Sequence, residues 1–440
     1  MAEPHRTGQI RRGTGGVRAG VRWMRGARLL GAVVALFGFT AIVTAAPARA
    51  SQPRTAAPQA SRPRTAAPQA SRPHTVAGSA WQVETTPNVV GAGINEFSAV
   101  SCNSATACTA VGSHAASFSS PGFSLAERWN GTSWRLQRTI LPNGAVSSTF
   151  TGVSCASATA CIAVGATIVK ATRRGVNLAE AWNGTTWRVQ AIPTPQGSTD
   201  SSLFAVSCTS PTACTAVGDY DTAAGSVVAE AERWNGTAWR IQTMPRPAKV
   251  TQLFGVSCPA ARACTAVGFQ NAGTGDAQPL AEAWNGTTWH VQAIPLPHNA
   301  PGGALSAVSC TSPGACTATG TDFSTTAPTL AERWNGTNWR VQPTPNPPNF
   351  TTSRQEVTLN GVSCTSATAC AATGQYAPGG NAAYFLEAWN GSSWRLVTAP
   401  LPAGFAQGAL NGVSCVPARC TAAGAWSGGP VPIATLALAN

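Results

Sequence analysis

Gly78-Ser79-Ala80-Trp81-Gln82-Val83 is the stretch of sequence that decides the fold, because it matches a pattern found much further along the chain. That pattern is Trp-Asn-Gly-Thr/Ser-x-Trp followed by Arg or His and an aliphatic residue, and it occurs six times. Its first tryptophans are Trp129, Trp182, Trp234, Trp284, Trp334 and Trp389. The stretch around Trp81 carries only the second half of the pattern, whereas residues 434–440 stand where a seventh first half is expected.

The cysteines repeat with the same period. The first cysteine of each close pair is Cys102, Cys155, Cys208, Cys258, Cys310, Cys364 or Cys415, at spacings of 53, 53, 50, 52, 54 and 51 residues. A period near fifty is typical of repeat architectures. The apolar runs of each repeat are too short for helices and are bounded by turn residues, so we expect four strands per repeat. In the third repeat these are residues 204–208, 214–218 and 229–234, and a strand that begins at Trp239.

The split repeat indicates how the repeats are arranged. Seven cysteine pairs stand against six complete tryptophan motifs, so the seventh repeat lacks a fourth strand that the stretch around Trp81 supplies. A linear array gains nothing from this arrangement, whereas a closed ring uses it to join its ends and to leave only short sheet edges. We therefore predict an all-β fold, a seven-bladed β-propeller with four-stranded blades whose last blade is closed by the N-terminal strand.

Residues 330–343 read Leu-Ala-Glu-Arg-Trp-Asn-Gly-Thr-Asn-Trp-Arg-Val-Gln-Pro. This segment resembles the second half of a kelch repeat, in which Glu-Arg-Tyr-Asp, a short turn, Trp, an apolar residue and Pro recur. The resemblance extends over all seven repeats and implies a secreted bacterial kelch-like propeller. The chain departs from the kelch pattern by its cysteine pairs and by one glycine after the second strand, where kelch repeats usually have two. These single glycines are Gly112, Gly165, Gly218, Gly268, Gly320, Gly374 and Gly424.

The fourteen cysteines are predicted to form seven disulfides, each within one repeat. Each pair straddles the turn between the first two strands, where facing residues are close enough to be bridged. The pairs are Cys102–Cys108, Cys155–Cys161, Cys208–Cys214, Cys258–Cys264, Cys310–Cys316, Cys364–Cys370 and Cys415–Cys420. Metal binding through thiolates is the alternative, but the repeats offer only His114, His290 and His298 as histidine partners. We therefore expect neither a metal nor another cofactor.

The N-terminal 77 residues predict export. Residues 1–28 carry seven arginines and one acid, residues 29–48 carry no charge, and Ala48-Arg49-Ala50 fits a cleavage site, so residues 1–50 are predicted to be a signal peptide. An uncleaved anchor is the alternative, because twenty uncharged residues can just span a bilayer. Residues 51–77 repeat a Pro- and Ala-rich decapeptide with four arginines, which predicts an extended linker, either a soluble spacer or a contact to an anionic cell surface. The propeller then occupies residues 78–440.

The net charge of +13 is unevenly divided. The predicted signal peptide contributes +7 and the linker +4, whereas residues 78–440, with 17 basic and 15 acidic side chains, contribute only +2. A nearly neutral domain argues against nucleic acid as a partner. We expect a secreted, extracellular monomer without stable membrane insertion once the signal peptide is removed.

Residues that recur in every repeat are interpreted as structural. Asn-Gly in the tryptophan motif suits a tight hairpin turn because glycine tolerates positive φ, although the same residues also form six Asn-x-Ser/Thr sequons. The paired tryptophans are expected to pack between blades. One glutamate per motif is spread evenly around the ring and is not expected to form a carboxylate pair. These glutamates are Glu127, Glu180, Glu232, Glu282, Glu332 and Glu387.

Function is sought where the repeats differ. The connections between the second and third strands, and from the fourth strand to the next blade, share one face of a propeller and vary here in length and composition. The second residue after the repeated glycine is His114, Thr167, Tyr220, Gln270, Asp322, Tyr376 or Trp426. We interpret these as a candidate ligand-binding circle, with a merely variable surface as the alternative. Asp219 and Asp221 flank Tyr220 and would attract a cation, although two acids alone make an incomplete calcium site. The connection over residues 343–359, with Asn349, Phe350 and Arg354, is long enough to reach over the rim.

Two classes of function follow. The first is a secreted, non-catalytic protein that binds a glycan, a cell-wall component or a protein through the variable face. The second is an extracellular enzyme, because some propellers similar to these are oxidases, lyases or glycosidases. A copper-radical oxidase needs His and Tyr ligands and an unpaired cysteine, which this composition disfavours. A glycosidase would draw its two acids from Asp200, Asp219, Asp221, Asp276, Asp322 and Glu356.

Overall fold

The computed structural model describes residues 80–440 except 274, 299, 325–327, 348–356 and 378–380. Within these residues the chain forms 28 β-strands joined by turns and loops, which confirms the predicted all-β class. This part of the chain has no helix long and apolar enough to cross a membrane. The predicted signal peptide and linker, and the loop residues Asn349, Phe350 and Arg354, lie outside the described residues.

The strands pair in antiparallel groups of four that follow the repeats. From the centre outwards, the first three groups are β2 (Ile94–Ser104), β3 (Ala107–Ala115), β4 (Phe123–Trp129) and β5 (Trp134–Gln137); β6 (Ala145–Ser157), β7 (Ala160–Val169), β8 (Gly175–Trp182) and β9 (Trp187–Val189); and β10 (Ser198–Ser210), β11 (Ala213–Thr222), β12 (Val227–Trp234) and β13 (Trp239–Gln242). The next three are β14 (Val250–Ala260), β15 (Ala263–Asn271), β16 (Gln278–Trp284) and β17 (Trp289–Gln292); β18 (Gly303–Ser312), β19 (Ala315–Asp322), β20 (Thr329–Trp334) and β21 (Trp339–Gln342); and β22 (Val357–Ser366), β23 (Ala369–Tyr376), β24 (Ala383–Trp389) and β25 (Trp394–Val397). The last group is β26 (Gln407–Val416), β27 (Arg419–Ser427), β28 (Ala434–Ala439) and β1 (Gln82–Glu84).

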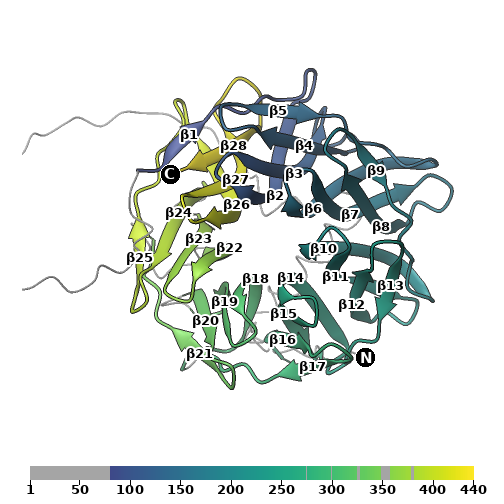
Figure 1. The fold of residues 1–440 in the computed structure, drawn as a ribbon, viewed down its shortest axis with the longest axis vertical. Coiled ribbons are helices and arrows are strands. Elements are labelled where there is room, and N and C mark those ends of the chain that lie inside the picture. The colour runs from purple at the N-terminus through teal and green to yellow at the C-terminus, as the bar shows by residue number, and fades with distance from the viewer. Residues whose placement is uncertain (1–79, 274, 299, 325–327, 348–356, 378–380) are drawn as a thin grey trace, which may run out of the picture.

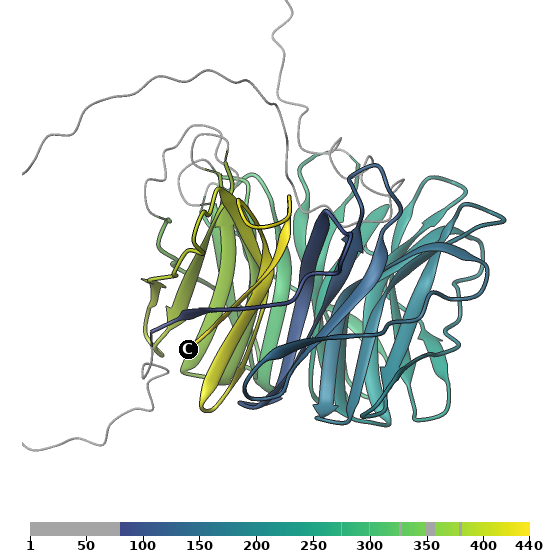
Figure 2. The ribbon, with the colours of Figure 1, turned by 90° about the horizontal axis from the view of Figure 1, so that it is seen from above.

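These groups are the blades of a propeller-type ring (Figure 1). Each innermost strand contacts the innermost strands on both sides, and the contacts continue from β26 to β2. The third and fourth blades share one eight-stranded sheet because Val227 of β12 forms a parallel bridge to Val250 of β14. Figure 2 shows the strands running between two faces of the ring.

The strands predicted for the third repeat are confirmed in position but are longer. The second strand, β11, continues past Gly218 to Thr222, because its pairing with both neighbouring strands continues. A register shift in β10 between Leu203 and Ala205 lies opposite Gly218. A Cβ atom at Gly218 would overlap the carbonyl oxygen of Ser202, so the close approach of the bulged strand explains the repeated glycine.

The Asn-Gly turns between the third and fourth strands have the predicted geometry. In the first blade Gly131 has φ of 96°, in the left-handed region that favours glycine. The side-chain oxygen of Asn130 accepts hydrogen bonds from the backbone N–H groups of Thr132 (3.0 Å) and Ser133 (2.9 Å). The same side-chain contacts recur in the other five turns, so this asparagine and glycine serve the turn.

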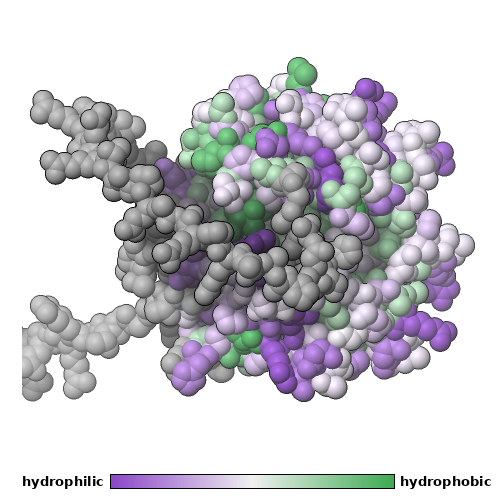
Figure 3. Space-filling model, turned by 60° about the vertical axis from the view of Figure 1, so that its left-hand side comes forward, coloured by the Kyte–Doolittle hydropathy of each residue, from purple (hydrophilic) through white to green (hydrophobic). Residues whose placement is uncertain are grey.

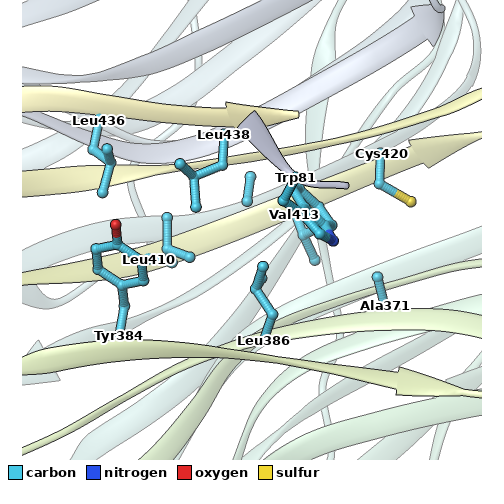
Figure 4. Packing of buried hydrophobic residues seen from close by; sticks show 10 residues of the cluster. Trp81, Ala371, Tyr384, Leu386, Leu410, Val413, Cys420, Leu436 and Leu438 are labelled. Carbon is cyan, nitrogen blue, oxygen red and sulfur yellow. The ribbon is translucent and has the colours of Figure 1, made fainter. Parts of the chain in front are cut away.

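Both ends of the described chain meet in the last blade. β1 pairs antiparallel with β28, with Gln82 opposite Ala439 and Glu84 opposite Ala437. Trp81, 6 % exposed, packs with Leu410, Val413 and Leu438 in the core of that blade (Figure 4). The N-terminal strand is therefore the outer strand of a sheet whose other three strands come from the C-terminus.

Glu84 links this blade to the first one. One carboxylate oxygen forms an ion pair with Arg419 on β27, and the other accepts a hydrogen bond from the indole N–H of Trp134 on β5 at 2.9 Å. Trp239 and Trp339 donate equivalent hydrogen bonds to Gln190 and Gln292 of the preceding blades, at 2.8 and 2.9 Å. Glu84 thus takes the place of a repeated glutamine and adds an ionic contact where the ends of the chain join.

All seven predicted disulfides are present, and no described cysteine is unpaired. Each joins facing residues of the first and second strands, as Cys208 faces Cys214. Disulfides of this kind persist in oxidising compartments.

Removing one disulfide is expected to weaken a single blade. The double substitution Cys208→Ala/Cys214→Ala should lower the free energy of unfolding by about 2 kcal/mol, because closing this short loop restricts the unfolded chain. Urea denaturation of the variant and the parent measures the difference. Equal midpoints and slopes for the two proteins would contradict this expectation.

Candidate functional site

The ring has two faces of different construction. The turn face consists of the turns between the first and second strands and between the third and fourth strands. The loop face consists of the connections between the second and third strands and from each fourth strand to the next blade. The two turns of one blade touch, since a Cβ atom on Gly131 would lie 3.1 Å from the Cβ of Thr106.

The residues of the candidate circle were expected in the connections of the loop face, and this placement is wrong. The second strands extend past the repeated glycine, so His114, Tyr220, Gln270, Asp322, Tyr376 and Trp426 are all strand residues. Their side chains mostly engage neighbouring strands. The ring of His114 lies 5.8 Å from that of Phe123, and the ring of Tyr376 lies 5.9 Å from that of Phe385.

Three members of the circle are buried, namely Thr167, Tyr220 and Asp322. Tyr220 is 8 % exposed, and its hydroxyl accepts a hydrogen bond from Arg246 at 2.8 Å. Asp322 is 3 % exposed and accepts a hydrogen bond from the backbone N–H of Ser324 at 2.7 Å. Trp426 is partly buried against the core of the last blade. His114, Gln270 and Tyr376 keep partial exposure near the loop face.

The two acids beside Tyr220 differ in environment. Asp219 is 1 % exposed, and its carboxylate accepts a hydrogen bond from the side-chain amide of Gln252 in the next blade. Asp221, two residues on, is partly exposed. Across the described residues, no three His, Cys, Asp or Glu side chains are placed to hold a metal ion together. The carboxylate of Asp219 therefore contacts the next blade through Gln252.

A second non-repeating set lies on the innermost strands and was missed in the sequence. Every first strand has a register shift, and the residue within it is Ser98, Thr151, Phe204, Phe254, Ser306, Asn360 or Asn411. All seven are partly exposed. Several connect adjacent blades, as Asn411 donates to the carbonyl oxygen of Phe97 at 2.7 Å and Phe204 lies 5.6 Å from Phe254 between ring centroids. In the sequence, this set could have been found as the one variable position directly before the repeated Ala/Gly-Val-Ser-Cys.

Exposed apolar side chains distinguish the loop face from the turn face. Among the described residues, the large hydrophobic side chains that are exposed belong to the outer strands or to the connections of the loop face, except Phe123, which begins β4. The connections carry Val90 (98 % exposed), Phe118 (52 %) and Leu401 (57 %). Exposed apolar groups that gather on one face are typical of interaction surfaces.

The turn face carries the tryptophans. The two tryptophans of each motif lie side by side with ring centroids 5.7–5.9 Å apart, as Trp182 and Trp187 do. The second of each pair is buried, which confirms the packing role expected for it. Trp129, Trp234 and Trp334 remain partly exposed, whereas Trp182, Trp284 and Trp389 are 7 % exposed.

Arginines cover the buried tryptophans at alternate junctions between blades. The guanidinium carbon of Arg128 lies 5.0 Å from the ring centroid of Trp182, Arg233 lies 4.8 Å from Trp284, and Arg333 lies 5.1 Å from Trp389. Arg128 also donates to the carbonyl oxygen of Ala158 in the next blade at 2.6 Å. The blades in between have Ala181, Ala283 and Ala388 at this position. The alternation of Glu-Arg-Trp and Glu-Ala-Trp is visible in the sequence, but only the structure shows what the arginine covers.

The repeated glutamates are buried between blades. All six are 0–1 % exposed, which fits their interpretation as structural residues. Neither carboxyl oxygen of Glu127, Glu282, Glu332 or Glu387 has a hydrogen-bond partner among the described residues. Burial raises the pKa of Glu127 to about 9 and the pKa values of Glu282, Glu332 and Glu387 to about 8. These carboxyl groups are therefore mostly protonated at neutral pH.

The third blade adds a second buried glutamate. Glu230 occupies the position that is Leu125 or Leu178 in the preceding blades, two residues before Glu232 on the same strand. Asn177 of the second blade donates a hydrogen bond to Glu232 at 3.0 Å. Burial, with the nearby Glu232 as the next cause, raises the pKa of Glu230 well above its ordinary value. At 1 % exposure, this pair lies too deep to meet a polymeric substrate.

Comparisons with known proteins reveal similarity only at low identity. No protein-family model matches the chain, and no curated protein matches it significantly. Among solved structures, it is similar to the fucose-specific lectin of Aleuria aurantia, with 11 % identity, a TM-score of 0.42, and coverage of 70 % of this chain and 97 % of the lectin. It is also similar to an ulvan lyase of polysaccharide lyase family 25 (9 % identity, TM-score 0.46, covering 74 % and 89 %) and to Trypanosoma rangeli sialidase (10 % identity, TM-score 0.41, covering 79 % and 55 %). Similarity at this level assigns no ligand or reaction to the chain.

Proposed function

We propose that this chain is a secreted, non-catalytic binding protein that holds a glycan, a cell-wall component or a protein on the loop face. The observation that carries the proposal is the gathering of exposed apolar side chains, such as Phe118 and Leu401, on this face.

The region around the first blade is the best-defined part of this surface. His114 packs on Phe123, which is 36 % exposed, and Phe118 lies in the connection between them. Ile140 and Leu141, 39 % and 40 % exposed, lie in the connection to the second blade. Of the candidate circle, His114, Gln270, Tyr376 and Trp426 remain proposed contacts, because they keep partial exposure.

The remaining sequence interpretations complete the proposal. Residues 1–50 act as a cleaved signal peptide, residues 51–77 as a linker, and residues 78–440 as one kelch-like propeller of seven blades. An extracellular glycosidase or lyase is the alternative, with Asp200, Asp221 and Asp276 as the acids that are at least partly exposed. Asp200 on β10 and Asp221 on β11 are cross-strand partners, whereas Asp276 lies in the connection between β15 and β16. We propose the binding function because, among the described residues, exposed large apolar side chains outnumber these acids at the loop face.

The proposal predicts that substitutions on the loop face weaken binding, whereas a similar substitution on an outer strand does not. The secreted protein is applied to arrays of glycans, cell-wall fractions and extracellular proteins, and binding is quantified for the best ligand. Phe118→Ser or Leu401→Ser should weaken that binding at least tenfold, because each removes an exposed apolar contact. Ile241→Ser is the matched control, since Ile241 is 42 % exposed but lies on the outer strand β13.

Two results would overturn the proposal. Equal loss of binding in the Ile241 control would remove the loop face as the site. Release of new reducing ends or unsaturated sugars from a bound polysaccharide would establish turnover and favour the enzyme alternative.

A further inference from the structure

Acidic and basic side chains of the propeller are segregated by depth. Of the 14 acids among the described residues, nine are buried: Glu127, Glu180, Asp219, Glu230, Glu232, Glu282, Asp322, Glu332 and Glu387. None of the described arginines or lysines is buried. On the side drawn in Figure 3, strongly hydrophilic side chains lie along the lower and right-hand edge of the molecule. The formal charge of +2 therefore understates how basic the exterior is.

Part of this basic exterior is a shallow depression on the turn face between the first two blades. It has a volume of about 370 Å³ and includes Arg128, Trp129, Arg135, Gln137 and Trp182 in its lining. Arg128 and Arg135 face each other directly across the β4–β5 pair. Trp129 follows Arg128 in the chain and is partly exposed, although its indole N–H is buried and the guanidinium carbon of Arg419 lies 4.8 Å from its ring centroid. Two cations and an aromatic surface thus share one hollow.

The two arginines lack a compensating charge. Neither forms an ion pair with a carboxylate among the described residues. Like charges directly opposite each other in a sheet are destabilising, so a bound anion would relieve this repulsion. Arg128 is already held in place by Trp182 and by the carbonyl oxygen of Ala158, so little side-chain entropy remains to be lost on binding. Arg135 is exposed and available to a ligand.

The arrangement occurs three times. Arg233 faces Arg240 in the third blade and Arg333 faces Arg340 in the fifth, each beside a partly exposed tryptophan, Trp234 or Trp334. In the alternate blades the exposed residue at this position faces alanine, as Arg188 faces Ala181, His290 faces Ala283 and Arg395 faces Ala388. We call the three complete sets the arginine–tryptophan sites.

We propose that the arginine–tryptophan sites bind anionic sugar units of an extracellular polysaccharide. A uronate, sulfate or phosphate group accepts hydrogen bonds from the paired guanidinium groups, and the sugar ring lies against the exposed indole. Anionic sugar polymers are favoured over nucleic acid because the seven disulfides place the protein in an oxidising, extracytoplasmic setting. Three sites on one face bind a repeating polymer with a higher apparent affinity than any single site has.

This binding site is distinct from the loop face, and the experiment keeps the two apart. The full-length secreted protein is titrated with polygalacturonate, dextran sulfate and a phosphomannan, which carry carboxylate, sulfate and phosphate groups respectively. Dextran is the neutral control, and a single-stranded oligonucleotide tests the competing class of polymer. We expect binding to at least one anionic polysaccharide, weakened at least tenfold between 50 and about 300 mM salt, and none to dextran.

Matched substitutions locate the binding. The triple variant Arg135→Gln/Arg240→Gln/Arg340→Gln should weaken binding of the preferred polysaccharide at least tenfold. The control Arg188→Gln/His290→Gln/Arg395→Gln changes the same strand position in the alternate blades and should weaken it less than threefold. Phe118→Ser should leave it unchanged, so a failure of the loop-face proposal remains separate.

Several outcomes would overturn the inference. Equal weakening by the two triple variants would show a diffuse charge effect instead of built sites. Binding to none of the three polysaccharides, equal binding of dextran, or tighter binding of the oligonucleotide would each remove the anionic sugar as the ligand.

Discussion

Replacing Trp81 by alanine is expected to lower the free energy of unfolding by about 3–5 kcal/mol, the range for removing a large aromatic side chain from a core. Trp81 is 6 % exposed and lies among Leu410, Val413 and Leu438. The loss should also release β1 from β28, since this strand has only three residues and depends on its anchor. Thermal unfolding followed by circular dichroism measures the stability.

The same substitution in another blade distinguishes the effect of a cavity in the core from the effect of losing the pairing of β1 with β28. Trp187 is 1 % exposed and is the corresponding tryptophan of the second blade, so Trp187→Ala should cost a similar amount of stability. Hydrogen exchange should then increase at residues 434–439 in the Trp81 variant but not in the Trp187 variant. Unchanged exchange there in both variants would show that β1 does not protect the last blade.

Replacing Glu282 by glutamine is expected to stabilise the protein at neutral pH. Burial raises the pKa of Glu282 to about 8, so the folded state keeps a proton that the unfolded chain releases near its ordinary value of 4.5. This contribution to stability is complete below pH 4.5 and is lost as the pH rises towards 8. At about 1.4 kcal/mol per pKa unit, the variant should gain up to about 3 kcal/mol over the parent at pH 7, and almost nothing at pH 4.5.

Urea denaturation at the two pH values measures this difference. Glu282→Leu is a second informative variant, because Leu438 occupies the equivalent register position in the last blade. Asp276→Asn, at an exposed acid, should change stability by less than about 0.5 kcal/mol at either pH. A gain for Glu282→Gln of the same size at pH 4.5 and pH 7 would mean that protonation of Glu282 is not its cause.

The sequence predicted the architecture because the repeats report the same local pattern many times. The half-motif at Trp81 and the cysteine spacing required only counting, and the pairing of β1 with β28 agrees with them. The position where a strand ends could not be predicted in this way, because it depends on pairing with the neighbouring strands. Pairing with β10 and β12 extends β11 beyond Gly218. Tyr220 was therefore assigned to a loop although it lies in a strand.

The proposed binding surfaces were harder to predict, because they depend on how deeply each side chain is buried and on contacts between blades. Counting charges gave a nearly neutral domain, yet the count does not reveal that Glu127 and its equivalents are buried while Arg135 and its equivalents are exposed. The alternation of arginine and alanine after the repeated glutamate is plain in the sequence. Its meaning depends on Trp182 of the next blade, 5.0 Å from Arg128 in the fold.

The shared last blade also sets the order in which the protein can fold. Thr86 and Thr435, whose hydroxyl groups are hydrogen-bonded at 2.7 Å, are 349 residues apart in the sequence. Contacts of such separation form slowly, because the chain between them must be organised first. A polypeptide emerging N-terminus first therefore holds Trp81 exposed until the last repeat has appeared, so this blade can be completed only after every other repeat has been made.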